Sequence, residues 1–178
     1  MRKYWTLLIV GAVCLCPYYT LGYPAEEQFL EKAEKGDAAS QFLLGYCYML
    51  GNNIPQNYKA AAKWMRKAAE QGHSEAQYHL STLYLQGLGV PIDEANAEKW
   101  MRKSKEQGFS GADLSYFQFK KAAENGDAEA QYTVGLYYHT GSFLAKNEAE
   151  AVKWWRKAAK QGHEQAKHAL KLYAPMKP

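Results

Sequence analysis

The residues that could perform catalysis are few and widely separated. The chain contains five histidines and three cysteines, but no His-Glu-x-x-His or Cys-x-x-Cys spacing groups them as zinc ligands. The Ser-x-x-Lys sequence used for serine acylation is also absent. The segment Gly108-Phe109-Ser110-Gly111-Ala112 half-resembles a nucleophile elbow, but it ends in alanine and no strand precedes it. The sequence therefore predicts no enzymatic activity, no cofactor and no metal site.

Tyrosine is the side chain that offers most to a binding partner, and 14 tyrosines are present. Tyr48, Tyr84 and Tyr138 recur at one slot of a repeat and are expected to pack. Tyrosines at other slots vary between copies, and a tyrosine supplies large contact area with a polar tip. We therefore predict a partner-binding surface formed by Tyr46, Tyr78, His79, Tyr132, Tyr137 and His139. Packing between repeats is the competing and simpler explanation of these residues.

An internal repeat positions these side chains. Gly36, Gly72 and Gly108 lie 36 residues apart, and Gly126 and Gly162 have the same separation. A tryptophan block precedes three of these glycines, as Trp64-Met65-Arg66-Lys67, Trp100-Met101-Arg102-Lys103 and Trp154-Trp155-Arg156-Lys157. Such self-similarity predicts a stack of repeated units that works by presenting a surface.

Each repeated unit is predicted to form two helices. Apolar residues such as Ala76, Leu80 and Leu83 recur at helical spacing. Polar side chains that can cap the first helix of a unit are Asp37, Ser74 and Asp127. Glycines suited to the left-handed residue that ends this helix are Gly51, Gly87 and Gly141.

Small residues mark a close approach between the two helices of a unit. Gly45 and Gly135 share one slot, where the middle unit has Ser81. Glycine inside a helix costs roughly 1 kcal/mol relative to alanine, so we expect the two backbones to pass closely there. The repeated tryptophan is expected to fill the space that glycine leaves. The Arg-Lys pairs should reach solvent with their stems over apolar surface.

The array is interrupted once, because Gly108 and Gly126 are only 18 residues apart. That interval is too short for a helix pair and its loop, so a single second-type helix is predicted at 113–125. An unpaired helix would kink or shift the stack and could open a groove between two halves. The alternative is a longer loop near 108–112 that restores regular stacking.

The repeated pattern Gly-[Asp/His]-x-x-Ala-Gln-x-x-Leu-Gly-x-x-Tyr-x-x-Gly, followed by Ala-x-x-Trp-x-x-Lys-Ala-Ala-x-x-Gly, resembles the Sel-1-like repeat family. The resemblance covers nearly all of the chain after residue 25. It implies an all-α fold, a right-handed α-solenoid of helix-turn-helix repeats related to tetratricopeptide repeats. The expected segments are a capping helix 25–35, repeats 37–72 and 73–108, an irregular half-repeat 109–126, a repeat 127–162 and a C-terminal cap 163–174.

The resemblance implies an adaptor or scaffold, and many bacterial members of the family are exported. We therefore predict binding of an as yet unidentified protein partner through the concave face of the solenoid. The alternative is a cell-envelope enzyme or binder that acts on peptidoglycan or β-lactams, as described for cysteine-rich relatives. Those relatives are implied to carry a cysteine pair in each repeat, which this chain lacks.

The first 22 residues have the pattern of a cleaved signal peptide. Arg2 and Lys3 precede a short apolar stretch, and Thr20-Leu21-Gly22 is an acceptable cleavage site. We expect a periplasmic or secreted domain of residues 23–178, with an uncleaved anchor as the alternative. Cys47 would then be the only cysteine in that domain, and is predicted to be either a buried thiol or part of an intermolecular disulfide.

Loss of Arg2 and Lys3 leaves 20 basic and 18 acidic residues, a net charge of +2. This near balance argues against nucleic acid as a partner. We also expect no stable membrane insertion after signal cleavage, and a monomer.

Overall fold

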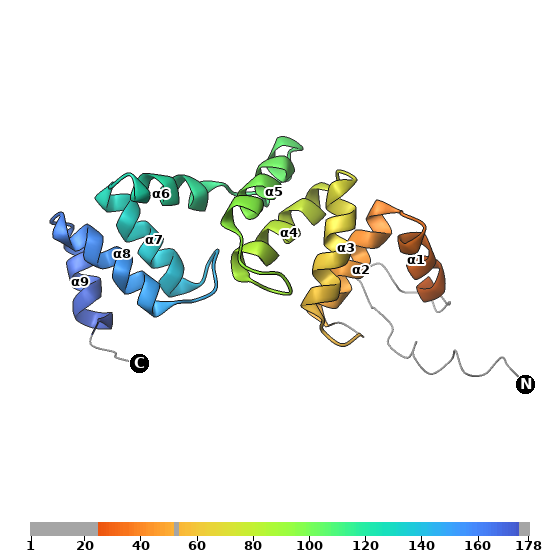
Figure 1. Cartoon of the computed structure of the whole chain (residues 1–178), viewed down its shortest axis with the longest axis horizontal. Helices are drawn as coiled ribbons and strands as arrows, with labels where there is room; N and C mark the ends of the chain where they lie inside the picture. The colour runs from red at the N-terminus through yellow and green to blue at the C-terminus, as the bar shows by residue number, and fades with distance from the viewer. Residues whose placement is uncertain (1–24, 52–53, 175–178) are drawn as a thin grey trace, which may run out of the picture.

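The computed structural model describes residues 25–51 and 54–174, in which all regular structure is α-helical (Figure 1). The predicted signal peptide, residues 1–22, lies outside the described residues. The helices are α1 (Ala25–Glu34), α2 (Ala38–Leu50), α3 (Tyr58–Glu70), α4 (Ser74–Gln86), α5 (Glu94–Glu106), α6 (Ser115–Glu124), α7 (Ala128–Thr140), α8 (Glu148–Lys160) and α9 (Glu164–Tyr173). Helices adjacent in sequence pack on one another, which confirms the α-solenoid. None of the helices in the described ranges has the length and apolar character needed to cross a membrane.

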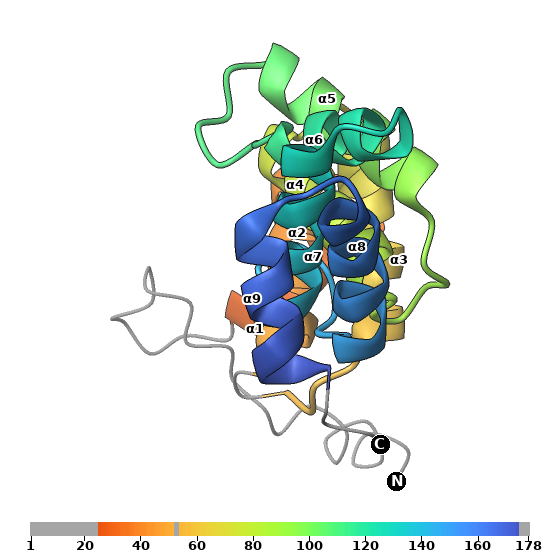
Figure 2. The same ribbon diagram turned by 90° about the vertical axis from the view of Figure 1, so that its left-hand side faces the viewer.

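The first-type helices of the repeat are α2, α4, α7 and α9, and the second-type helices are α1, α3, α5, α6 and α8. The two types alternate within each half of the chain, so that each first-type helix packs against second-type neighbours. Figure 2 looks along the stack from the end formed by α8 and α9, which lie side by side in front.

Helix ends follow the predicted chemistry with one correction. The carboxylates of Asp37 and Asp127 accept hydrogen bonds of 2.7 Å from the backbone N–H groups of Ser40 and Ala130. In α4 the cap is His73 and not Ser74, because Ser74 is already the first helical residue. The predicted C-terminal glycines adopt left-handed conformations with φ of 73°, 69° and 74° at Gly51, Gly87 and Gly141.

The two helices of a repeat approach closely at the predicted glycines, but the residue that fills the space is not the repeated tryptophan. A Cβ atom on Gly135 would lie 2.3 Å from Nε1 of Trp155, and one on Gly45 would lie 3.1 Å from Cγ of Met65. Both residues directly follow the repeated tryptophan. The prediction is wrong by one residue. One residue turns a side chain by about 100° around the helix axis, because a helix has 3.6 residues per turn.

The repeated tryptophans instead pack toward the preceding second-type helix. Trp100 of α5 joins a buried cluster with Ala62 and Met65 of α3, and Trp154 of α8 joins one with Ala123 of α6. Lysines cover the outer faces of these rings, with Nζ distances to the ring centroid of 4.3, 4.9 and 3.9 Å for Lys67, Lys103 and Lys157. The lysines are exposed, as predicted for charged groups whose stems lie over apolar surface.

A single helix, α6, occupies the interval between Gly108 and Gly126, as the half-period spacing predicts. Among the described residues, α5 and α6 do not pack along one another, although every other sequential pair does. In Figure 1, α5 and α6 do not run alongside one another. The stack is therefore interrupted, and the alternative in which a loop restores regular stacking is wrong.

Side chains fill the joint between the two halves. Leu85, Ala97 and Met101 of the first half form one buried cluster with Tyr116, Phe117 and Leu144 of the second. One ion pair also crosses it, with Nζ of Lys120 lying 3.2 Å from Glu94. The joint is thus a small core of its own.

Cys47 is buried in α2, with 3% of its surface exposed. It is disulfide-bonded, so of the two predicted alternatives the buried thiol is wrong. The chain's two other cysteines, Cys14 and Cys16, lie outside the described residues.

Candidate functional site

The first-type helices present a row of aromatic rings that links one repeat to the next. Phe42 of α2 stacks on His73, with 4.6 Å between ring centroids, and Tyr132 of α7 stacks on His163 at 4.7 Å. Tyr78 of α4 packs at a tilt on Phe109 at 5.3 Å. In each case the second ring lies 31 residues later, immediately after the repeat glycine. Tyr78 and Tyr132 therefore contribute to packing between repeats.

The stacked histidines also cap the helices that they begin. Nδ1 of His73 accepts a hydrogen bond from the N–H of Ala76 at 3.3 Å, and Nδ1 of His163 accepts one from Ala166 at 3.2 Å. Because Nδ1 accepts, the ring proton of a neutral histidine lies on Nε2, and Nε2 of His163 is 2.9 Å from Glu129. Burial lowers the pKa of His73, an effect that nearby carboxylates partly oppose. The two histidines therefore cap α4 and α9.

Three of the six predicted binding residues come together in the first half of the chain. The ring of His79 lies 5.4 Å from Tyr46, 5.0 Å from Tyr78 and 5.9 Å from Phe42. All are half-buried. Desolvation lowers the pKa of His79 to about 4. At neutral pH this cluster is therefore uncharged and largely apolar.

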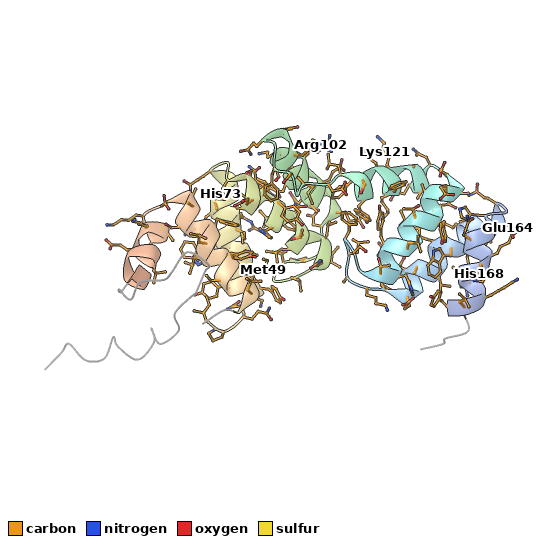
Figure 3. All side chains as sticks on the ribbon, turned by 180° about the vertical axis from the view of Figure 1, so that it is seen from behind. Met49, His73, Arg102, Lys121, Glu164 and His168 are labelled. Carbon is orange, nitrogen blue, oxygen red and sulfur yellow. The ribbon has the colours of Figure 1, made fainter. Side chains whose placement is uncertain are left out.

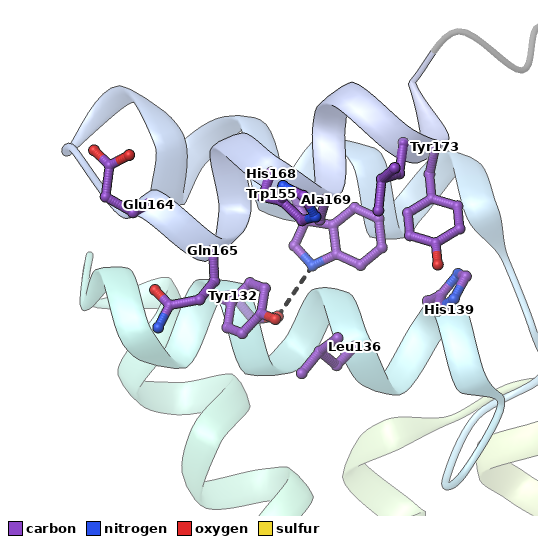
Figure 4. Close-up of a pocket in the computed structure, with 10 residues that line it drawn as sticks. Tyr132, Leu136, His139, Trp155, Glu164, Gln165, His168, Ala169 and Tyr173 are labelled. Atoms are coloured by element: carbon purple, nitrogen blue, oxygen red, sulfur yellow. Dashed lines mark hydrogen bonds between the residues drawn. The ribbon is translucent and has the colours of Figure 1, made fainter.

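A pocket of about 480 Å³ lies between α7 and α9 and holds two more of the predicted residues (Figure 4). Tyr132 and His139 line it from α7, and Trp155 lines it from α8. The rest of the lining consists of Leu136, Glu164, Gln165, His168, Ala169, Leu172 and Tyr173. Aromatic and aliphatic side chains form most of the wall, with a few polar groups among them, which is the usual composition of a binding pocket.

Trp155 is the buried anchor of this pocket. Its side chain is fully buried, and its indole N–H donates to the backbone oxygen of Tyr132 at 3.2 Å. The rings of His139 and Tyr173 pack together at 4.4 Å and lie 5.5 and 5.7 Å from the Trp155 ring. These contacts hold the wall of the pocket in a defined position.

Hydrogen bonding orients His139. Its Nδ1 lies 2.9 Å from one carboxylate oxygen of Glu148 and 3.0 Å from the other, and this hydrogen bond lowers the pKa of Glu148. At the other side of the pocket, Glu164 and His168 are exposed on α9, as Figure 3 shows. Leu172 is 51% exposed at the same helix. The pocket thus combines a fixed wall with an accessible rim.

Tyr137, the sixth predicted residue, lies apart from both groups. It packs in the joint, 4.9 Å from Phe143 and 5.9 Å from Tyr116. The Tyr116 hydroxyl is buried and makes no hydrogen bond to any described residue. Burial raises the pKa of Tyr116, and the nearby carboxylate of Glu94 adds to the increase.

The buried polar side chains of the described residues mostly hydrogen-bond to neighbouring helices. Within residues 25–51 and 54–174, no three His, Cys, Asp or Glu side chains converge to hold a metal ion. The buried hydroxyls of Ser81 and Ser104 donate to the backbone oxygens of Ala97 and Ser74, at 2.8 and 2.7 Å. These serines therefore stabilise contacts between helices.

Sequence reasoning missed several residues of the two aromatic groups. Phe42 and His168 share the repeat slot of Tyr78 and Tyr132, so alignment of the copies contained the signal. Trp155 and Tyr173 gave no such signal, because their place in the pocket depends on how α8 and α9 pack against α7.

Comparison with known proteins identifies the repeats. The Sel1 repeat model matches residues 38–73, 74–109, 119–127 and 128–163. The short third match covers the end of α6, in agreement with the half-repeat. Secretory immunoglobulin A-binding protein EsiB of Escherichia coli O6:H1 is 36% identical over 62 residues, which are 35% of this chain and 13% of that protein.

Solved structures similar to this chain include two Sel1-type repeat proteins. One is c5321, a protective antigen of uropathogenic Escherichia coli strains that displays an SLR fold, with 36% identity and a TM-score of 0.43. That match covers 81% of this chain and 27% of the c5321 chain. The other is a Sel1 repeat protein from Oxalobacter formigenes, with 33% identity, a TM-score of 0.42, and coverage of 84% and 98% of the two chains.

Proposed function

The chain belongs to the Sel1 repeat family, and from that premise we propose that it is an exported adaptor whose pocket between α7 and α9 binds a segment of a partner protein. Sel1 repeats generally mediate protein–protein interaction, and the family is typically a scaffold without catalytic activity. The location of the binding surface and the export of the chain are the parts that we propose.

The single observation that carries the proposal is the pocket itself. Its volume of about 480 Å³ accommodates one large side chain of a partner with its flanking backbone. Trp155 is buried behind the pocket, and its hydrogen bond to Tyr132 and its contact with His139 make the apolar wall rigid. Interfaces gain most of their affinity from a few buried aromatic or aliphatic anchors that enter such pockets. We therefore expect the partner segment to present an aromatic or large aliphatic residue.

Five of the six residues predicted from sequence divide between two contact regions in this proposal. Tyr132 and His139 contact the partner anchor directly. Tyr46, Tyr78 and His79 form a second, uncharged patch in the first half that extends the binding surface. Tyr137 supports the joint and has no direct contact in this scheme, in contrast to the sequence-based hypothesis.

Export rests on the pattern of residues 1–22. A periplasmic or secreted protein would begin at Tyr23 after cleavage beyond Gly22. Mass spectrometry of the intact protein from the cell envelope or the medium tests this, and an N-terminus at Met1 would contradict it. The immunoglobulin binding named for EsiB is not carried over, because this chain matches only 13% of that protein.

The pocket is tested with a peptide selected from a random display library on the purified protein. Its affinity is then measured by fluorescence anisotropy for Leu172→Glu and for the matched control Leu50→Glu. Both leucines lie on first-type helices and are 51% and 45% exposed, but only Leu172 lines the pocket. We expect Leu172→Glu to weaken binding by about tenfold or more, the loss of about 1.4 kcal/mol that one buried leucine can supply. Equal affinities for the two variants would show that the pocket is not the site.

A further inference from the structure

A basic groove lies on the second-type helix α3, away from the pocket between α7 and α9. It has a volume of about 280 Å³ and lies between α3 and the loop that follows α4. Its walls are formed by Lys59, Ala62, Lys63, Arg66, Lys67 and Glu70 of α3 and by Gly89 and Val90 of the loop. Four of these eight residues are cations and one is a carboxylate.

The four cations of the groove form no ion pair with any residue that the structure describes. No carboxylate of the described part of the chain lies within salt-bridge distance of Lys59, Lys63, Arg66 or Lys67. Arg66 instead donates to the Tyr84 hydroxyl at 2.7 Å. That single bond positions the guanidinium and leaves its other N–H groups available.

In the matching helices α5 and α8, a cation at a repeat position shared with α3 forms an ion pair within its own helix. Arg102 of α5 binds Glu98, and Lys153 of α8 binds Glu150. The positions of these two glutamates correspond to Ala62 and Ala60 in α3. Each of the three helices has four cations. Helix α3 has one carboxylate, whereas α5 has three and α8 has two. The small alanine at position 62 also forms part of the groove wall.

The groove wall is formed before any ligand binds. Gly89 has a φ of 72°, and a Cβ atom there would lie 2.1 Å from the backbone oxygen of Tyr58. The loop backbone therefore rests directly on the first turn of α3, and only glycine permits that approach. Val90 packs on the buried cluster between α3 and α4, which fixes the other side of the loop.

We propose that this groove binds an extended acidic segment of a partner protein. The cations from Lys59 to Lys67 recur on successive turns of one helical face, over about 12 Å at 1.5 Å per residue. An extended peptide rises about 3.3 Å per residue, so three alternate carboxylates span a similar length. A single phosphate would engage only one turn. The groove shares no residue with the pocket between α7 and α9, so peptide binding at the groove can be tested independently of the proposed function.

The probe is a fluorescent ten-residue peptide of alternating glutamate and serine, and binding to the purified protein is measured by anisotropy at about 50 mM salt. The test variant carries Lys63→Gln with Lys67→Gln. The matched control carries Lys153→Gln with Lys157→Gln, which removes the same charge from the same slots of α8. We expect the test variant to raise Kd at least about tenfold and the control less than about twofold.

A second variant, Ala60→Glu, adds the carboxylate that α8 has at Glu150 and leaves every lysine in place. It should pair with Lys63 and raise Kd several-fold without loss of helix content by circular dichroism. Equal losses from the α3 and α8 double variants would overturn the proposal, because they would indicate general attraction to net charge. Absence of peptide binding, or binding of phosphatidylglycerol vesicles through the same lysines without binding of the peptide, would also overturn it.

Discussion

Gly135→Ala tests the packing that builds the pocket wall. A Cβ atom at this position would lie 2.3 Å from Nε1 and 2.4 Å from Cδ1 of Trp155, whereas ordinary carbon contacts begin near 3.4 Å. The indole ring is completely buried and would have to move by about 1 Å, with loss of its hydrogen bond to Tyr132. Overpacking of this kind costs about 1–3 kcal/mol, and a lost hydrogen bond costs about 1 kcal/mol. The helix propensity of alanine returns about 1 kcal/mol.

We therefore expect Gly135→Ala to lower the free energy of unfolding by about 1–3 kcal/mol, the balance of these three effects. The matched control is Gly45→Ala, where the new Cβ atom would lie 3.1 Å from the flexible Met65 side chain and from backbone atoms of α3. Smaller movements suffice there, so its change should stay within about 1 kcal/mol. Urea unfolding followed by tryptophan fluorescence measures both variants. A Gly135→Ala protein as stable as the wild type, or less affected than Gly45→Ala, would refute the packing argument.

Three further predictions concern polar groups that are buried or half-buried. Tyr116→Phe should leave stability unchanged or raise it by up to about 1 kcal/mol in thermal unfolding, because the hydroxyl it removes makes no hydrogen bond to any described residue. As pH falls from 7.5 to 5, the unfolded chain protonates His79 while the folded chain, with a pKa of about 4, holds it neutral. Stability should therefore fall by up to about 2 kcal/mol, and His79→Gln should reduce that fall in urea titrations at the two pH values. Lys120→Met breaks the ion pair with Glu94 across the joint and should speed chymotrypsin cleavage in residues 107–114 several-fold, whereas exposed Lys121→Met should not. An unchanged rate for Lys120→Met would argue that the apolar cluster alone holds the joint.

Most of the fold could be predicted because its signals are local. The glycine spacing predicts where helices end, since left-handed residues such as Gly51 and Gly141 stop a helix by their own conformation. Asp37 and Asp127 cap helices that begin at the next residue. The half-period between Gly108 and Gly126 leaves room for only one helix, and α6 is found there.

The candidate site could be predicted only in part. Tyr46, Tyr78 and His79 were identified from differences between repeats, and the structure brings them together. The same reasoning grouped Tyr137 with them, although it packs in the joint. The position of a residue in the repeat determines the direction in which its side chain points from its own helix. The residues that the side chain contacts depend on how the surrounding helices pack. At the interruption those contacts change, so the repeat logic fails there.

By itself the sequence determined the helices and their caps, because these depend on residues within a few turns of one another. It also determined the repeat and the place of its interruption, because both are given by the spacing of like residues along the chain. Only the tertiary structure decided that Trp155 and not Trp154 fills the space beside Gly135, since a rotation of one residue around α8 selects between them. The pocket between α7 and α9 and the groove on α3 are also evident only in the tertiary structure. Both depend on contacts between residues more than 20 positions apart, whose geometry follows from helix packing and not from local pattern.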